Sequence, residues 1–296
     1  MKYIGRFAPS PSGPLHFGSL VAALGSWLDA RANNGQWLVR VEDLDPPREM
    51  AGAIDLILKS LEAHRLYWDG EILYQSQRLD AYEAVIASLK KQRKIYPCTC
   101  TRKIIRANGG LHQRCHVPDS TLDSETEVAW RLLVDNNSNH FEDIFHGPQT
   151  LDIEQSNEDY VLKRKDNLHA YMLAVVVDDI HQDITHVIRG SDLAHTSCQQ
   201  RYLFETLNSV PPGFGHLPMA LHPNGDKLSK QTHARALNDK DAYNNILSAL
   251  SFLNQDLPKE DDYHTISDLL TWATNHWQPG KFLELTSKVT EQKQFL

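Results

Sequence analysis

The chain has 296 residues, 41% of them hydrophobic, and its 30 basic and 38 acidic side chains give a formal net charge of −8 with histidine neutral. That length allows one large domain or two modest ones, and the negative charge is not typical of proteins that coat nucleic acid. No apolar run approaches the ~20 residues of a membrane span, and none follows the basic N-terminus as it would in a signal peptide. The cysteines are few and clustered, which argues against a disulfide scaffold. We therefore expect a cytoplasmic protein.

The first twenty residues, MKYIGRFAPSPSGPLHFGSL, combine an apolar run, a Pro/Gly turn and the start of a helical pattern. Residues 3–8 suit a buried strand, and the helical pattern begins near His16. An α/β fold presents a phosphate site in this way, because the helix N-terminus offers free N–H groups and a partial positive charge. Gly18 lets a base or a phosphate lie against the backbone, and His16 and Ser19 add hydrogen-bonding side chains. Taken alone, the unit fits an ordinary strand-to-helix turn equally well.

The next predicted strand, Trp37 to Val41, leads into a cluster of carboxylates that begins at Glu42. Carboxylates at the carboxyl end of such a strand lie where open α/β sheets bind ligands. Amphipathic helices are predicted for Met50 to Leu66 and for Leu79 to Leu89.

Residues 98–115, CTCTRKIIRANGGLHQRC, bring three thiols and an imidazole into one short segment. Cys98, Cys100, His112 and Cys115 can complete a tetrahedral zinc site, and the Gly-Gly pair lets the chain turn back. The pattern predicts a structural zinc ion, and reduced, buried cysteines without a metal are the alternative. The fourth cysteine, Cys198, lies in a helical stretch and is expected to serve packing.

The rest of the chain continues the α/β pattern. Strand character recurs at Glu127 to Val134, Tyr160 to Lys163 and Thr185 to Arg189. The stretch 135–160 is polar and is expected to be loop-rich. A helix capped by Ser191 or Asp192 is predicted to run to Leu207, and two further helices are predicted at Tyr243 to Leu253 and Ile266 to Trp277.

A second segment with phosphate-binding chemistry is NGDKLSKQ, residues 224–231. By itself it is a basic, solvated turn. However, activation of a carboxylate by ATP puts negative charge on the transferred phosphate and on pyrophosphate, so fixed cations and N–H dipoles serve this reaction better than a nucleophile. Lys227 and Lys230 would supply mobile charge, and His16 and Ser19 the fixed part.

HFGS at residues 16–19 and KLSK at residues 227–230 together resemble the paired ATP signatures of class I aminoacyl-tRNA synthetases, and RFAPSPSGPLHFGSL with WLVRVEDLD resembles the glutamyl branch of that class. The first signature often ends in a histidine, where this chain has Ser19, a weaker donor. The resemblance implies an α/β, Rossmann-like catalytic domain with a zinc-containing insertion and a short helical C-terminal region. The expected parts are residues 1–93 and 161–237 for the halves of the nucleotide-binding domain, 94–160 for the zinc-bearing insertion and 238–296 for the helical region.

The resemblance also assigns side chains to substrates. His16, Gly18 and Lys230 would bind ATP, and the residues that assist the chemistry would be His16, Ser19, Lys227 and Lys230. Arginines can hold carboxylates in paired hydrogen bonds, a carboxylate can accept from the ammonium group, and hydroxyls add neutral hydrogen bonds. On this basis glutamate would be bound by Arg6, Ser10, Glu42, Tyr171 and Arg189. Outside the resemblance, each arginine is more often a surface or salt-bridge residue.

The zinc segment departs from the related short enzymes at its third ligand position, which commonly holds a tyrosine. His112 aligns there, one residue closer to the last cysteine, and His116 is a rival ligand. ATP chemistry also implies Mg²⁺, for which the chain offers no motif of its own.

The resemblance ends near residue 237, and the roughly sixty residues that follow are too few for the anticodon-binding domain of full glutamyl-tRNA synthetases. The chain therefore most resembles the short glutamyl-queuosine tRNA(Asp) synthetases. That family implies a monomer that activates L-glutamate with ATP and transfers it to the queuosine base in the anticodon loop of tRNA(Asp), whose diol offers a hydroxyl. Clustered basic residues at 90–106 and 163–165 would permit RNA binding. The alternatives are a truncated glutamyl-tRNA synthetase that charges a tRNA 3′ end, a small nucleotidyltransferase, and a catalytically inactive zinc-bearing RNA-binding module.

Overall fold

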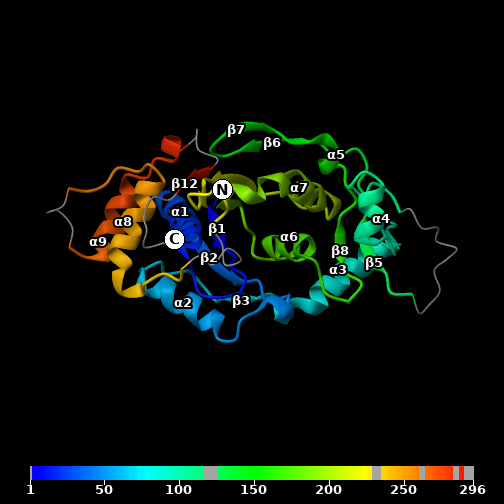
Figure 1. Cartoon of the computed structure of the whole chain (residues 1–296), viewed down its shortest axis with the longest axis horizontal. Coiled ribbons are helices and arrows are strands. Elements are labelled where there is room, and N and C mark those ends of the chain that lie inside the picture. The colour runs from blue at the N-terminus through cyan, green and yellow to red at the C-terminus, as the bar shows by residue number, and fades with distance from the viewer. Residues whose placement is uncertain (1, 116–125, 229–234, 260–263, 283–286, 290–296) are drawn as a thin grey trace.

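A computed structural model describes residues 2–115, 126–228, 235–259, 264–282 and 287–289 of the chain. Figure 1 shows a central sheet region with the C-terminal helices at one end of the molecule and a small sheet with helix α4 at the other. The helices are α1 (Phe17–Ala32), α2 (Ala53–Ala63), α3 (Leu79–Lys91), α4 (Arg102–Ala107), α5 (Ile153–Ser156), α6 (Tyr171–His181), α7 (Ser197–Thr206), α8 (Ala242–Phe252) and α9 (Ile266–Asn275).

The main sheet is largely parallel. It consists of two adjacent parts. One has the order β3 (Leu73–Tyr74), β2 (Gln36–Val41) and β1 (Ile4–Phe7), and the other has the order β9 (His186–Gly190), β10 (Gly213–Leu217), β6 (His140–Asp143) and β7 (Gly147–Thr150). The N–H of Thr185 donates to the carbonyl of Ile4 at 2.9 Å and joins the two halves between β1 and β9. Strand order reverses there, and open α/β sheets bind ligands beyond the carboxyl ends of the strands at such a point. The expected α/β class is confirmed.

A second, antiparallel sheet consists of β4 (Ile95–Cys98), β5 (Ala129–Leu132) and β8 (Val161–Lys163). It shares an apolar core with α3 and α6, in which Tyr82, Leu132, Leu162 and Leu173 are fully buried. This arrangement fixes the segment that follows β4, where the clustered cysteines lie.

Helix α1 forms the centre of the larger core. It contacts β1, β9, α8 and α9, and its buried side chains include Phe17, Leu20, Leu24 and Leu28. Phe17 meets Phe252 of α8 edge to face at 5.5 Å between ring centroids. The C-terminal helices therefore cover the face of α1 that the sheet leaves open (Figure 1). None of the described helices is long and apolar enough to cross a membrane.

Most predicted elements are confirmed, but the stretch 135–160 is not simply loop. It contains α5 and the hairpin β6–β7, and β6 pairs with β10 of the main sheet. Burial alternates along β6, but one of the two inward positions holds a charged residue, Asp143, so the usual apolar pattern of a strand is missing. The predicted cap at Ser191 or Asp192 is wrong: residues 191–196 form a 3₁₀ turn, and α7 begins at Ser197. Strands β3, β4, β10, β11 (Met219–Leu221) and β12 (Ser287–Val289) are also absent from the sequence prediction.

Candidate active site and metal centre

The first cavity, of about 440 Å³, lies at the N-terminal end of α1. His16, Gly18 and Ser19 line it from the start of the helix, and Lys227 lines it from the second predicted ATP signature. Lys230 lies outside the described residues. The structure thus brings both predicted ATP segments to one cavity.

His16 is the N-cap of α1, and its Nδ1 accepts a hydrogen bond from the N–H of Ser19 at 3.3 Å. An accepting Nδ1 places the ring proton on Nε2, which can then donate to an anionic ligand. Gly18 is packed tightly, because a Cβ there would lie 3.2 Å from the His16 ring and 3.3 Å from the carbonyl of Leu228. Any side chain at this position would crowd the cavity.

The backbone ties the flanks of the two ATP segments together. The N–H of Leu237 donates to the carbonyl of Leu15 at 2.9 Å, and Ala236 forms a β-bridge with His16. At the start of the second ATP segment, Lys227 forms an ion pair with Asp192. Charge from the second segment is therefore held close to the helix N-terminus.

A second cavity, of about 490 Å³, adjoins the first, and Ser10 and Ser12 line both. Glu42 and Tyr171 line the second cavity alone, from the end of β2 and the start of α6. Its outer wall is polar and carries Asp45, Arg48, Glu49, Arg164 and His169. The predicted glutamate-binding residues Ser10, Glu42 and Tyr171 are thus brought together next to the first cavity.

Arg6 and Glu42 belong to a buried charge network. Asp179 accepts from Arg6 Nε at 3.1 Å and from Arg40 Nη1 at 2.7 Å, and these three side chains are at most 5% exposed. Burial raises the pKa of Glu42, and the charges of Arg40 and Arg6 oppose that rise. Glu42 Oε1 lies 3.6 Å from Arg40 Nη2 and has no hydrogen-bond partner within the described part of the chain. A substrate ammonium group could supply the missing donor.

Arg189, the remaining predicted glutamate ligand, is buried and held from several sides. Its Nε donates to His216 Nε2 at 3.1 Å, its Nη1 to Gln200 Oε1 at 2.7 Å, and its Nη2 to Ser197 Oγ at 2.9 Å. Gln200 also donates from its Nε2 to the Tyr171 hydroxyl at 3.4 Å, so it connects Arg189 to a residue of the second cavity. Burial lowers the pKa of Arg189, yet the group remains a cation because its ordinary pKa is so high.

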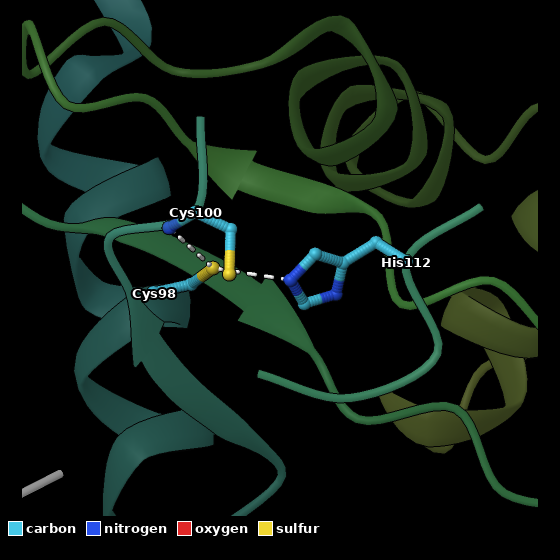
Figure 2. A group of neighbouring side chains, drawn as sticks. All are labelled: Cys98, Cys100 and His112. Atoms are coloured by element: carbon cyan, nitrogen blue, oxygen red, sulfur yellow. Dashed lines mark hydrogen bonds between the residues drawn. The ribbon is translucent and has the colours of Figure 1, made fainter. Parts of the chain in front are cut away.

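Three of the four predicted metal ligands meet beside β4, whereas Cys115 Sγ does not lie within 4.8 Å of all of their ligand atoms. The ligand atoms of Cys98, Cys100 and His112 lie within 4.8 Å of one another, and all three residues are buried (Figure 2). The Cys98 Sγ to His112 Nε2 distance is 3.2 Å, and the Cys100 Sγ to Cys115 Sγ distance is 3.9 Å. The rival ligand His116 lies outside the described residues.

These separations fit zinc. Zinc bond lengths and tetrahedral angles put two sulfurs about 3.8 Å apart and a sulfur and a nitrogen about 3.5 Å apart. The observed sulfur–sulfur and sulfur–nitrogen distances are close to those values. Burial raises the pKa of the Cys98 thiol to about 11, so zinc binding would release its proton.

Two further residues orient His112. The Tyr96 hydroxyl donates to Asp159 Oδ2 at 2.7 Å, so its oxygen can accept from His112 Nδ1 at 3.2 Å. The proton then belongs to Nδ1, and Nε2 presents its lone pair toward Cys98. Metal-binding histidines are usually fixed in this manner by a partner on the other ring nitrogen.

The chain matches the family model described as "tRNA synthetases class I (E and Q), catalytic domain" over residues 3–248. It belongs to the class I tRNA synthetases. The expected ATP-dependent ligase class is therefore confirmed at the level of the family.

Curated relatives align with almost the whole length of this class I synthetase. It is 47% identical to the glutamyl-Q tRNA(Asp) synthetase of Vibrio vulnificus (strain YJ016), over 97% of this chain and 95% of the relative. It is 48% identical to the glutamyl-Q tRNA(Asp) synthetase of Klebsiella pneumoniae (strain 342), over 95% of each chain. The similarity to the predicted short family is thus confirmed.

A solved structure shows the same fold. The crystal structure of glutamate-tRNA synthetase from Elizabethkingia anophelis matches with a TM-score of 0.79 at 24% identity. The match covers 95% of this chain and 66% of that chain. The synthetase described here therefore spans slightly less than two thirds of the longer enzyme.

Sequence reasoning missed several residues that shape the synthetase site. Asp179, Arg40 and His216 each contact a predicted residue, and Asp143 in turn pairs with His216. Asp179 carried a signal, because two adjacent acidic residues follow the apolar run 171–177. Arg40 stands inside an apolar strand, which also marks it as unusual. The contribution of Asp143 and His216 depends on pairing of β6 with β10, which the sequence did not reveal.

Proposed function

We propose that this class I synthetase activates L-glutamate with ATP and transfers the glutamyl group to the queuosine base in the anticodon loop of tRNA(Asp). The observation that carries the proposal is near-complete similarity, at 47–48% identity, to relatives named glutamyl-Q tRNA(Asp) synthetase. The two adjoining cavities support it, because one joins the ATP segments and the other gathers groups that suit a dicarboxylic amino acid.

In the glutamate site, Arg6 and Arg189 bind the carboxylates and Glu42 accepts from the ammonium group. Ser10 and Tyr171 add neutral hydrogen bonds. The orphaned oxygen of Glu42 supports its role, since a buried acceptor without a donor is costly until a ligand provides one. Arg6 has fewer N–H groups left for a substrate carboxylate, because its Nε and Nη2 already donate to Asp179.

In the nucleotide site, Gly18 leaves room for ATP against the helix backbone, and His16 Nε2 donates to a phosphate oxygen. Ser19, Lys227 and Lys230 add charge stabilisation as pyrophosphate leaves. Mg²⁺ would arrive with ATP and neutralise part of the phosphate charge. We propose that the enzyme works as a monomer in the cytoplasm, where tRNA is found.

We further propose that Cys98, Cys100, His112 and Cys115 hold one structural zinc ion. Four protein ligands leave no open position for a substrate, which is typical of a structural site. The ion would tie the end of β4 to the segment after the Gly-Gly pair, and Tyr96 and Asp159 would keep His112 in its metal-binding tautomer.

Purified protein should contain about one zinc per chain, as expected of a closed four-ligand site. Replacing His112 with alanine should remove the metal, because Nε2 of this residue faces Cys98. The milder change Tyr96→Phe should weaken zinc binding roughly 10- to 100-fold, since it removes only the partner of the ring. Chelator competition measures both effects. His116→Ala is the matched control, and loss of zinc from that variant but not from His112→Ala would show that the other histidine is the ligand.

The names of the relatives support the proposed acceptor. The short relatives that match over nearly their whole length share the queuosine-related name, whereas the matched glutamate-tRNA synthetase is longer. An enzyme that acts on the queuosine base must read the reacting nucleotide and its neighbours directly. RNA loops suit such recognition, because their bases can be splayed out and read on their edges.

Radiolabelled glutamate should therefore be transferred to tRNA(Asp) from cells that make queuosine and not to tRNA(Asp) from cells that cannot. Removal of the 3′-terminal adenosine should leave transfer intact. Equal labelling of queuosine-free tRNA, or loss of labelling after 3′ trimming, would favour a truncated enzyme that charges the 3′ end. An inactive RNA-binding module would show no glutamate-dependent ATP–pyrophosphate exchange.

A further inference from the structure

Asp143, His216 and Arg189 form a buried hydrogen-bond relay that ends at Arg189, a proposed ligand of glutamate. Asp143 Oδ2 lies 2.5 Å from His216 Nδ1, and Arg189 Nε lies 3.1 Å from His216 Nε2. The residues are 2%, 2% and 5% exposed, respectively. We propose that Asp143 and His216 are positioning residues that hold Arg189 for the glutamate carboxylate, an inference that rests on the proposed function.

The direction of each hydrogen bond follows from the chemistry of arginine. A guanidinium only donates, so His216 Nε2 must be the unprotonated nitrogen and accept from Arg189. The ring proton is therefore on Nδ1, from which it is donated to Asp143. Burial lowers the pKa of His216, which favours the neutral ring that this arrangement requires.

The sheet brings the three residues together. His216 in β10 lies directly opposite Arg189 in β9 in the parallel register, and Asp143 is contributed by β6, the next strand along. Asp143 is itself fixed, because its Oδ1 accepts from the N–H groups of Phe145 and His146 at 2.9 and 3.0 Å. The turn of the β6–β7 hairpin thereby sets the position of a substrate-binding arginine on another strand.

The other contacts of Arg189 do not replace this one. Gln200 accepts from Nη1, and Ser197 and the carbonyl of Leu193 accept from Nη2. The Nε–H group is directed at His216, so losing that acceptor would leave a buried donor unpaired and the guanidinium plane less constrained.

The first test is Asp143→Asn, which preserves size but can present an amide donor to Nδ1. That would favour the tautomer with its proton on Nε2, which cannot accept from Arg189. We expect the KM for glutamate in ATP–pyrophosphate exchange to rise roughly 10- to 100-fold, the scale of one lost buried partner. The KM for ATP should stay within about twofold and kcat should change little, since the lost contact serves ground-state binding. His216→Phe should give the same pattern.

The second test is rescue. His216→Gln places a side-chain oxygen that can accept from Arg189 without help from Asp143, so its KM for glutamate should be much closer to that of the wild type. In this background Asp143→Asn should have no further effect on that KM. The matched control is Thr150→Val, which changes the exposed side of the same hairpin, where Thr150 contacts only His140 among the side-chain partners given by the structure.

The outcomes separate the two proposals. Wild-type protein without glutamate-dependent exchange would overturn the proposed function itself. Normal wild-type exchange with an unchanged glutamate KM in Asp143→Asn and His216→Phe would overturn only the positioning roles. Equal increases in the KM values for ATP and glutamate, or equal effects of Asp143→Asn in both backgrounds, would likewise contradict the relay. Thermal unfolding and zinc content of each variant identify those that fail to fold.

Discussion

Replacing Asp179 with asparagine should destabilise the synthetase by about 3–5 kcal/mol, the scale of removing one partner from a buried ion pair. Asp179 is the shared acceptor for Arg6 and Arg40, and the pair distances are 3.1 and 2.7 Å. Without its negative charge, two buried guanidinium groups lose the carboxylate to which both donate, and Glu42 remains beside Arg40. Urea unfolding followed by circular dichroism would measure the loss of free energy.

The same variant has a characteristic dependence on pH. Burial alone would raise the pKa of Asp179, but Arg40 and Arg6 hold it below its ordinary value. The stability contributed by the charged form is therefore complete above the unfolded pKa of about 3.9 and is lost as pH falls through the folded value. The difference between wild type and Asp179→Asn should persist down to about pH 5 and shrink below about pH 4.

Asp183→Asn is the matched control for this prediction. Asp183 is exposed and follows the same helix, and its positive φ of 52° suits asparagine. We expect its unfolding free energy to stay within about 0.5 kcal/mol of wild type. A similarly small change in Asp179→Asn would mean that Arg6 and Arg40 find other counter-ions.

Lys230→Ala should lower glutamate-dependent ATP–pyrophosphate exchange by roughly 10²-fold or more, the scale of losing one donor that stabilises transition-state charge. Although Lys230 lies outside the described residues, Ala236 and Leu237 after its segment are tied to the start of the helix at Phe17, and Lys227 before it pairs with Asp192. The loss should fall mainly on kcat, because pyrophosphate charge develops during the reaction.

Lys59→Ala is a suitable control, since Lys59 is an exposed residue of α2 and lines neither cavity. Exchange at the wild-type rate in Lys230→Ala would remove this lysine from the mechanism. A rise in the KM for ATP without loss of kcat would instead assign it to binding of the nucleotide.

The sequence predicted those parts of the site that depend on local patterns. The first helix could be placed at His16 because a Pro/Gly turn precedes an apolar period of 3.6 residues. The zinc ligands could be proposed because all four lie in one segment of eighteen residues, 98–115. Both predictions needed only the chemistry of neighbouring residues.

The parts that could not be predicted depend on contacts between distant segments. Asp143 and His216 are 73 positions apart, and Arg6 and Asp179 are 173 apart. Strands are identified by alternating apolar residues, and the charged residue Asp143 at a buried position interrupts this pattern in β6. The residue that gives β6 its proposed role is therefore also the reason that the sequence does not predict the strand. The same cause hid the contribution of 135–160 to the main sheet.

The position of α1 has a consequence for synthesis of the chain. Its Asp29 accepts from the indole N–H of Trp277, a partner 248 positions later. Ribosomes add about 5–20 residues per second, so roughly 12–50 s separate the two residues during translation. For that period the apolar face of α1 that later meets α8 and α9 is without its cover. An apolar face that stays exposed during translation favours the binding of chaperones to the newly made chain.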